Sequence, residues 1–202
     1  MIWKVVFSGV GGQGVISAGI ILGEAAVIYE NRYAVQSQNY GAEMRGGVSR
    51  ADVTISDDPV IYPKVDQAHV LVCLHRKGLH AHLTTLRPGG ILINDADEAP
   101  VRTRVDCRQY PIPITATVRS ELGTTRGVNI AVLGVLTALT SVVRAESLRE
   151  AVIARYDAPR RGLEENLRAL ELGLGIGREI VPETSFIGDA DTRGRHATSS
   201  RI

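Results

Sequence analysis

Apolar and polar positions alternate along this 202-residue chain in two kinds of segment, short apolar runs and longer stretches with helical spacing. The short runs are bounded by glycine, proline and polar turn residues, a pattern typical of strands. The run His69 to Leu74 (HVLVCL) is apolar at most positions, as expected for a strand covered on both faces. We predict strands over residues 2–8, 33–37, 48–56, 69–74, 90–94 and 105–110.

The longer stretches predict helices over residues 15–29, 77–86, 127–143, 146–156 and 163–174. The last helix is amphipathic, with a single stripe made of Leu163, Leu167, Leu170 and Leu174. Residues 127–143 are nearly all apolar, and one packing face is formed by Ala131, Gly134 and Ala138. Arg87-Pro88-Gly89-Gly90 is a signal that ends a helix, so we expect it to close the helix 77–86 and turn into the next strand.

Strands that alternate with helices predict an α/β fold, with a Rossmann-like, doubly wound and mostly parallel sheet followed by C-terminal helices. We expect one domain over residues 1–177 and an extended tail over 178–202. The tail has few large apolar side chains and many Gly, Thr, Ser and Arg, so composition alone predicts disorder. The alternative, which we favour, is that it docks on a partner subunit.

Composition narrows the class of protein. Hydrophobic residues make up 44% and charged residues 22%, as in a globular domain with a real core. A net charge of +1 with few aromatics gives no reason to expect nucleic acid or an anionic membrane as a partner. The start Met-Ile-Trp-Lys resembles no targeting peptide, and Val128 to Val143 is too short and polar to span a bilayer. Cys73 and Cys107 form no CxxC, so we expect no metal site in this chain alone and a cytoplasmic location.

A glycine-rich turn lies between the first strand and the first helix. Gly9, Gly11 and Gly14 match GxGxxG, which allows a tight turn, a close approach of backbone to phosphate and close packing of helix on strand. The amides of Gly11 to Gly14 would then face an anion at the helix N-terminus. The alternative is that the glycines serve turn geometry and packing alone.

The NAD-binding fingerprint also needs an acidic residue at the end of the second strand, where it holds a ribose hydroxyl. Here that region is Ala34 to Gln38 (AVQSQ), which contains no carboxylate, and Arg32 comes too early to bind a 2′-phosphate. The turn therefore predicts a phosphate-bearing ligand, but the sequence argues against hydride transfer by a free-standing NAD dehydrogenase.

A second unusual loop spans Tyr40 to Gly47 (YGAEMRGG). Arg45 stands before two glycines and offers a rigid fork of donors beside exposed amides, suited to a carboxylate or phosphate. An ion pair between Arg45 and Glu43 or another nearby acid is the alternative, and Arg45 alone does not decide between them.

Four segments together resemble one family: GVGGQGV at 9–15, NYGAEMRGGVSRADVTIS at 39–56, DPVIYPKVDQAHVLVCL at 58–74 and NIAVLG at 129–134. They are similar to the gamma subunit of the 2-oxoacid:ferredoxin oxidoreductases, which also occurs as a domain of fused pyruvate:ferredoxin enzymes. The resemblance covers residues 1–174. The combination of GxGGQG with YGxExRGG makes it specific.

The resemblance implies a place in a multi-subunit enzyme that oxidatively decarboxylates a 2-oxoacid and forms an acyl-CoA. Thiamine diphosphate with Mg²⁺ would lie between alpha and beta subunits, and iron–sulfur clusters on the beta and ferredoxin-like delta subunits would pass electrons to ferredoxin or another acceptor. This chain would bind no cofactor alone and supply no catalytic residue, but would complete the active-site cleft or CoA site.

The resemblance, mapped onto this sequence, places eight residues at the cleft or CoA: Gly11, Gly12, Gln13, Gly14, Tyr40, Gly41, Arg45 and Gly46. Asn129 at a helix start could contact the cleft or cap the helix, and we favour the cap. The substrate could be of the 2-oxoglutarate, pyruvate or arylglyoxylate type, and the segment YGAEMRGGVSRADV favours the 2-oxoglutarate type. Two other functions stay open: an indolepyruvate oxidoreductase beta subunit and a stand-alone nucleotide-binding protein.

Three histidines and two serines are weaker candidates. We expect His75, His80 and His82 to lie on a solvated helix face rather than to share a metal, because residues 80 and 82 point to different sides of a helix. Ser8 and Ser17 lie near the glycine turn but have no identifiable histidine and acid partners. The sequence therefore predicts no catalytic triad.

Overall fold

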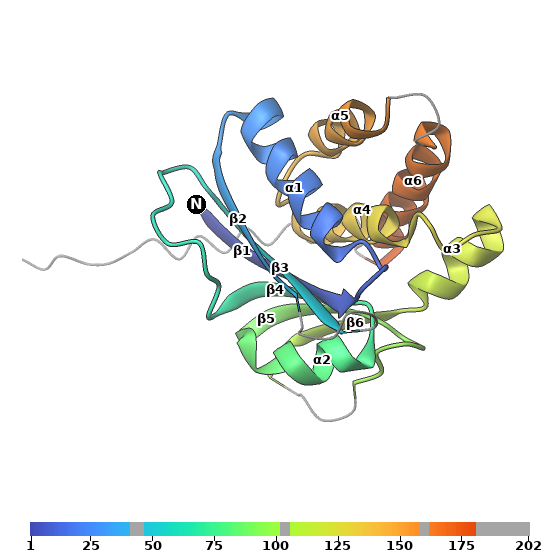
Figure 1. Ribbon diagram of the computed structural model, residues 1–202, viewed down its shortest axis with the longest axis horizontal. Coiled ribbons are helices and arrows are strands. Elements are labelled where there is room, and N and C mark those ends of the chain that lie inside the picture. The colour runs from blue at the N-terminus through green and yellow to red at the C-terminus, as the bar shows by residue number, and fades with distance from the viewer. Residues whose placement is uncertain (41–46, 102–105, 158–161, 181–202) are drawn as a thin grey trace, which may run out of the picture.

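The computed structural model describes residues 1–40, 47–101, 106–157 and 162–180. These ranges form a six-stranded sheet with helices on both faces (Figure 1). The strands are β1 (Ile2–Val10), β2 (Tyr33–Tyr40), β3 (Val48–Ser56), β4 (Ala68–Cys73), β5 (Leu86–Asp95) and β6 (Arg108–Ile112). The helices are α1 (Val15–Glu30), α2 (Arg76–His82), α3 (Ile114–Leu122), α4 (Val128–Thr140), α5 (Ala145–Tyr156) and α6 (Leu163–Ile180), with a short 3-10 helix, η1 (Leu83–Thr85).

The strands follow the order β2-β3-β1-β4-β5-β6 across the sheet. β1, β4, β5 and β6 pair in parallel, whereas β3 runs antiparallel to both β1 and β2. All strands except β3 therefore point the same way, which confirms the predicted α/β fold with a mostly parallel sheet. β3 is reversed because it forms a hairpin with β2, and this hairpin places β3 rather than β2 beside β1.

Hydrophobic side chains cover both faces of the sheet, because successive residues of a strand point to opposite sides. Phe7 belongs to the large core beneath α1, α4, α5 and α6, and its neighbour Val6 belongs to the smaller core beneath α2. Figure 1 shows these four helices on one side of the sheet and α2 on the other. None of the helices in the described ranges is long and apolar enough to cross a membrane.

Glycines allow α4 and α6 to pack in close contact. A Cβ atom on Gly173 would lie 1.9 Å from the carbonyl oxygen of Ala131, and one on Gly134 would lie 2.6 Å from that of Leu170. The predicted packing face with Ala131 and Gly134 is thereby confirmed. α6 continues to Ile180, beyond the predicted end of the helix, so residues 178–180 are helical.

Two predicted boundaries at β5 and β6 are wrong. The segment Arg87-Pro88-Gly89-Gly90 does not turn between a helix and a strand, because β5 already begins at Leu86 and contains it. Gly89 supplies the positive φ of 73° that this part of β5 requires, and the register with β4 shifts nearby. β6 spans Arg108–Ile112 rather than 105–110, and Pro111 is tolerated there because β6 is an edge strand.

Candidate functional site

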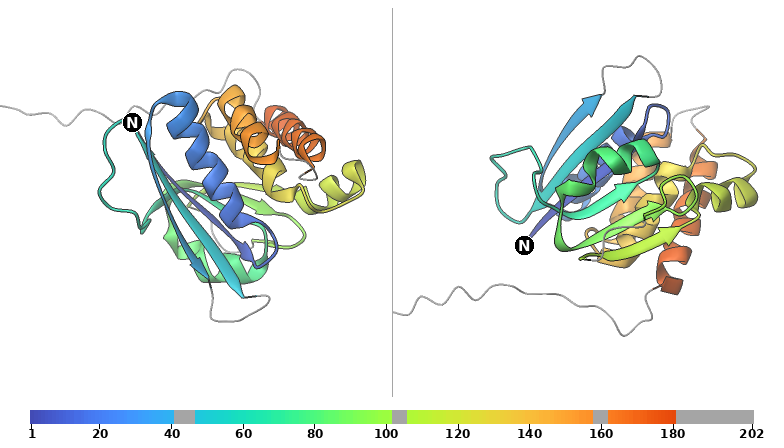
Figure 2. Two further views of the ribbon diagram at one scale, coloured as in Figure 1. Left: turned by 45° about the horizontal axis from the view of Figure 1, so that its top comes forward. Right: turned by 90° about the horizontal axis from the view of Figure 1, so that it is seen from below.

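The glycine turn lies where the chain leaves the sheet in two directions. β1 is followed by α1 on one face, and its parallel neighbour β4 is followed by α2 on the other face (Figure 2). Ligands of open α/β sheets bind at such a switch point, beyond the carboxyl ends of the strands. We call this place the switch-point rim; it comprises Gly9 to Gly14 and His75 to Lys77.

Gln13 builds the turn with its side chain. Its Oε1 accepts the N–H of Val10 at 2.9 Å, and its Nε2 donates to the carbonyl oxygen of Leu74 at 2.9 Å. The N–H of Gln13 also donates to the carbonyl oxygen of Val10 at 3.1 Å. Gln13 thus ties the turn to the end of β4, and its predicted contact with a ligand stays a prediction.

The glycines of the turn have different neighbours. A Cβ atom on Gly9 would lie 2.5 Å from Oε1 of Gln13, and one on Gly14 would lie 2.8 Å from the side chain of Asn129, so a larger residue at either position would displace one of these side chains. Gly14 also has a positive φ of 71°. Gly12 is exposed with a φ of 95°, and its Cβ position has no neighbour within 4 Å in the described part of the chain. The structure therefore leaves space beside Gly12, where a ligand is predicted.

The second predicted loop begins and ends beside this turn. The N–H of Gly11 donates to the carbonyl oxygen of Gly47 at 3.1 Å, and Val10 pairs with Val48 at the end of β1. Tyr40 is the last residue of β2, which is longer than the predicted strand 33–37. Gly41, Arg45 and Gly46 lie outside the described residues, so their approach to a ligand stays a prediction.

Two helices begin at the rim with their positive ends uncompensated. α1 begins after Gly14 and α4 after Gly127, and in the ranges described here neither has an acidic residue in its first turn or a side-chain cap. Exposed Arg126 precedes α4, and exposed Arg76 and Lys77 begin α2. Helix N-termini and basic side chains both favour anions, so the rim can hold a phosphate.

Asn129 connects the two helices. Its Nδ2 donates to the carbonyl oxygen of Gly14 at 3.4 Å, and its side chain packs against that residue. The predicted cap is wrong, because Asn129 lies one residue inside α4 and the residue at the cap position is Gly127. Its contact instead holds the start of α4 against the glycine turn.

A buried serine and a half-buried histidine lie beneath the rim, a pair that the sequence did not reveal. Oγ of Ser8 is 2.7 Å from Nδ1 of His82, and Ser8 is fully buried. Burial lowers the pKa of His82, and the positive charge of Arg50 lowers it further. The predicted solvated position of His82 is therefore wrong, and the pair fixes α2 on β1 rather than presenting a nucleophile to solvent.

His75 and His80, the other two histidines considered in the sequence, both belong to the region of α2. Nδ1 of His75 accepts the N–H of Lys77 at 3.1 Å and caps α2, whereas His80 is exposed. Nowhere in the described ranges do three or more metal-binding side chains gather.

A model of the pyruvate ferredoxin/flavodoxin oxidoreductase family matches residues 4–176. The chain belongs to this family. It is 40% identical over 176 residues to the 2-oxoglutarate synthase subunit KorC of Methanocaldococcus jannaschii, a match that covers 86% of this chain and 92% of KorC. The crystal structure of the keto/oxoacid ferredoxin oxidoreductase gamma subunit from Geobacter sulfurreducens PCA is similar, with 35% identity, a TM-score of 0.77 and coverage of 88% of this chain and 99% of that one.

The fold also occurs within a longer protein. The 2-oxoglutarate:ferredoxin oxidoreductase from Magnetococcus marinus, solved with 2-oxoglutarate, coenzyme A and succinyl-CoA bound, matches with a TM-score of 0.79 at 20% identity. The match covers 89% of this chain and 32% of that one. Membership of the pyruvate ferredoxin/flavodoxin oxidoreductase family confirms the resemblance found in the sequence, and the chain is a gamma-type subunit of a 2-oxoacid:ferredoxin oxidoreductase.

Proposed function

We propose that this gamma subunit completes the CoA site of a cytoplasmic, thiamine-dependent enzyme that converts a 2-oxoacid and CoA to an acyl-CoA, CO₂ and a proton, with two electrons passed to ferredoxin. The observation that carries the proposal is the switch-point rim, where α1 and α4 begin and the Cβ position of Gly12 has no neighbour within 4 Å among the described residues. CoA presents phosphates, and helix N-termini with nearby cations bind phosphate. Gly11, Gly12 and Gly14 would supply backbone approach, and Arg45 a charged contact.

The remaining chemistry is proposed for other chains. Alpha, beta and ferredoxin-like delta subunits would hold thiamine diphosphate, Mg²⁺ and the iron–sulfur clusters, as the sequence resemblance implies. The longer Magnetococcus chain supports such a partnership, because a domain of this fold forms about a third of it, 32%. We propose 2-oxoglutarate as the substrate, since KorC is a subunit of a 2-oxoglutarate synthase.

Purification of this chain from its own cells tests the assembly. We expect further protein chains to co-purify with it, together with the brown absorbance of iron–sulfur clusters and a 2-oxoacid-dependent reduction of ferredoxin that requires CoA. Comparison of 2-oxoglutarate, pyruvate and indolepyruvate as substrates separates the proposed enzyme from its relatives. Recovery of this chain without any other chain would contradict the proposal.

Kinetics of the assembled enzyme test the CoA site. Gly12→Val would place a branched side chain in the open space at the rim, and Arg45→Ala would remove a cation, so both should raise the KM for CoA more than the KM for the 2-oxoacid. Gly89→Val is the matched control, because Gly89 also has a positive φ, 73°, and an open Cβ position among the described residues, but lies near the opposite ends of the strands. An unchanged KM for CoA in both the Gly12 and the Arg45 variants would mean that the glycines serve packing alone.

A further inference from the structure

The two edges of the sheet are built differently. β6, at one edge, has five residues that include Arg108 and Pro111, and both residue types discourage pairing with another strand. β2, at the other edge, has eight residues, Tyr33–Tyr40, without charge or proline, and its register with β3 is continuous. Natural sheets protect such edges or cover them. Within the described residues, β2 has β3 as its one neighbouring strand, so no other described strand pairs with its outer edge. The loop after β3 contacts β2 at one point, where Oγ of Ser37 donates to the carbonyl oxygen of Pro63 at 3.3 Å.

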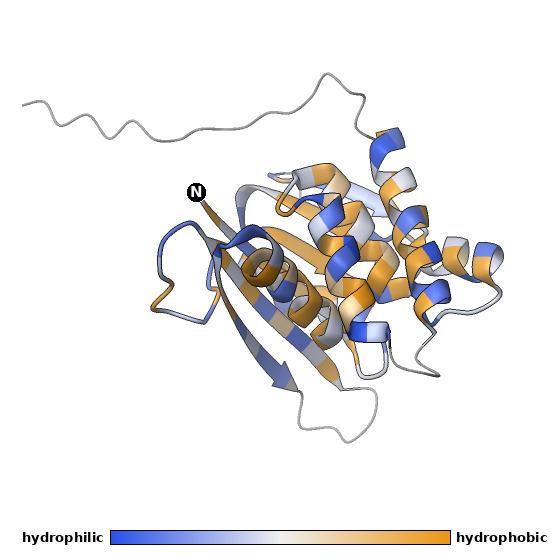
Figure 3. Cartoon of the chain, turned by 90° about the horizontal axis from the view of Figure 1, so that it is seen from above, coloured by the Kyte–Doolittle hydropathy of each residue, from blue (hydrophilic) through white to orange (hydrophobic). Residues whose placement is uncertain are grey.

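Helix α1 covers β2 and β3 and is mostly apolar, with Ser17, Glu24 and Glu30 among its few polar residues. A Cβ atom on Gly19 would meet Ala51 and Val53 of β3 at 3.0 and 3.2 Å and Gln36 of β2 at 3.7 Å, so this side of α1 faces the hairpin. On the opposite flank, Ser17 and Glu24 face α5. Figure 3 shows the largely hydrophobic α1 crossing the hairpin.

A partly exposed apolar stripe lies on the flank of α1 toward β2. We call it the α1 stripe; by helical spacing it consists of Ile16, Ile20, Gly23 and Val27. Val27 is 46% exposed, and the Cβ position of Gly23 is open, with no described atom within 4 Å. Because this flank is apolar, a partner that covered it would remove apolar surface from water.

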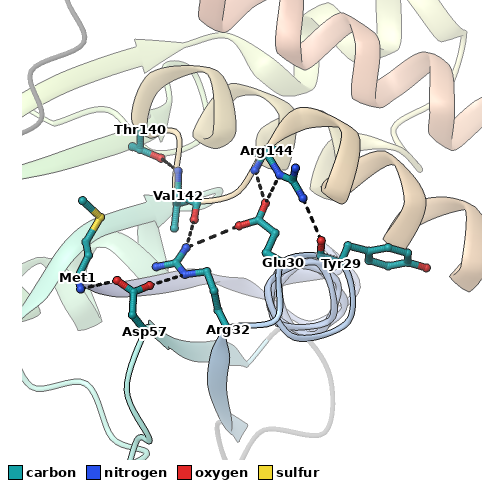
Figure 4. A network of polar contacts seen from close by, with 8 residues as sticks. All are labelled: Met1, Tyr29, Glu30, Arg32, Asp57, Thr140, Val142 and Arg144. Carbon is teal, nitrogen blue, oxygen red and sulfur yellow. Dashed lines mark hydrogen bonds and ion pairs between the residues drawn. The ribbon is translucent and has the colours of Figure 1, made fainter.

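Charged groups around this edge neutralise one another within the chain. Arg32 lies 3.0 Å from Asp57, which also binds the N-terminal ammonium group at 2.6 Å (Figure 4). Glu30 lies 3.6 Å from Arg144. These pairs reduce the like charge that two copies of this surface would bring together.

We propose that β2 and the α1 stripe form an interface between two copies of this chain. The two β2 strands would pair antiparallel about a twofold axis near Gln36 and Ser37, which would join two sheets into one. Because β2 carries no charge, no like charges meet in any register of the strand with itself. The two α1 stripes would then face each other above the joined sheet, and Gly23 allows the helices a close approach.

Sedimentation equilibrium of the full chain tests the interface. The wild type should sediment at twice 21.7 kDa, and Gly23→Glu and Gln38→Lys should each raise the dissociation constant by at least about tenfold, because each puts like charges across the twofold axis. Gly175→Glu is the matched control, since Gly175 is also a helical glycine whose Cβ position is open in the described structure. We expect it to leave the dissociation constant unchanged.

Cross-linking tests the same interface in the assembled enzyme. Gln38 is exposed on β2, so Gln38→Cys with a short bismaleimide should link two copies of this chain. A monomer at all concentrations, a dimer unaffected by Gly23→Glu and Gln38→Lys, or a link from residue 38 to a different subunit would each overturn the proposal. None of these results bears on the role of the chain in CoA binding, which is read from co-purification and KM values.

Discussion

Gln13 is the residue whose side chain shapes the glycine turn. Gln13→Ala would leave the N–H of Val10 and the carbonyl oxygen of Leu74 without their partner in a partly buried place. We expect the free energy of unfolding to fall by about 1–3 kcal/mol, the usual effect of such unpaired groups. Urea denaturation of the purified chain measures the change, with exposed Gln67→Ala as the control. Equal effects of the two substitutions would show that the hydrogen bonds of Gln13 do not stabilise the turn.

His69 should make stability depend on pH. Burial, followed by the charges of Arg87 and Lys4, lowers the pKa of His69 from 6.5 to about 4, and its Nδ1 accepts the N–H of Lys4 at 2.9 Å. The unfolded chain therefore takes up this proton first, so the stabilisation is complete above about pH 6.5 and is lost as the pH falls toward about 4.

His69→Asn offers an acceptor that does not titrate, and should flatten the pH dependence of the unfolding free energy in that window. Urea titrations at several pH values measure it. A dependence of the unfolding free energy on pH that is due to His82 should persist in this variant, because the pKa of His82 is also lowered. An unchanged slope would mean that His69 does not contribute to it.

Residue roles could be predicted from sequence where they depend on neighbours in the chain. The GxGxxG spacing indicated the turn, because strand, glycines and helix are contiguous. Leu74, which accepts a hydrogen bond from Gln13, is 61 positions away, and the serine that meets His82 is 74 positions away, so neither contact leaves a local signal. Asn129 was assigned as a cap for the same reason, since Gly14 lies 115 positions from it.

At the scale of elements, α4 and α6 pack so closely that their contact tolerates little increase in side-chain size. Gly173→Ala would place a Cβ atom 1.9 Å from the carbonyl oxygen of Ala131, so one helix must move, with an expected loss of about 1–3 kcal/mol or more. Gly175→Ala on the same helix meets no described atom within 4 Å and should stabilise by about 0.5–1 kcal/mol through helix propensity. Thermal and urea unfolding measure both, and effects of the same sign would contradict this packing.

Elements were predictable where apolar spacing was regular, and less so where pairing in the sheet overrides local signals. The strand 48–56 was predicted with its observed bounds because its alternation is regular. The turn signal at residues 87–90 failed because pairing with β4 extends β5 back to Leu86. Nothing in the sequence indicated that β3 lies between β2 and β1. Residues 34–38, the segment without an acidic residue, therefore lie on an edge strand that β3 separates from β1 and its glycine turn.

At the scale of the whole molecule, the switch-point rim and the proposed interface lie on different surfaces. The switch-point rim, with its helix N-termini and basic residues, lies beyond the carboxyl ends of β1 and β4, whereas the proposed interface lies along β2 and one flank of α1. Pairing of β2 strands would leave both rims accessible, because the rim lies at the ends of strands and pairing uses their edge. Two copies could therefore each complete a CoA site in one assembly.

Residues 181–202 allow a last prediction about assembly. Their composition has few large apolar side chains, so they contribute little to a core, and deletion after Ile180 should change the free energy of unfolding of the isolated chain by no more than about 0.5 kcal/mol. If the tail docks on a partner subunit, as the sequence predicts, the same deletion should weaken reconstitution with the other subunits. Binding titrations with the purified partners measure this, and scrambling residues 181–202 is the control for length. Equal affinity of the full and shortened chains would show that the tail does not dock there.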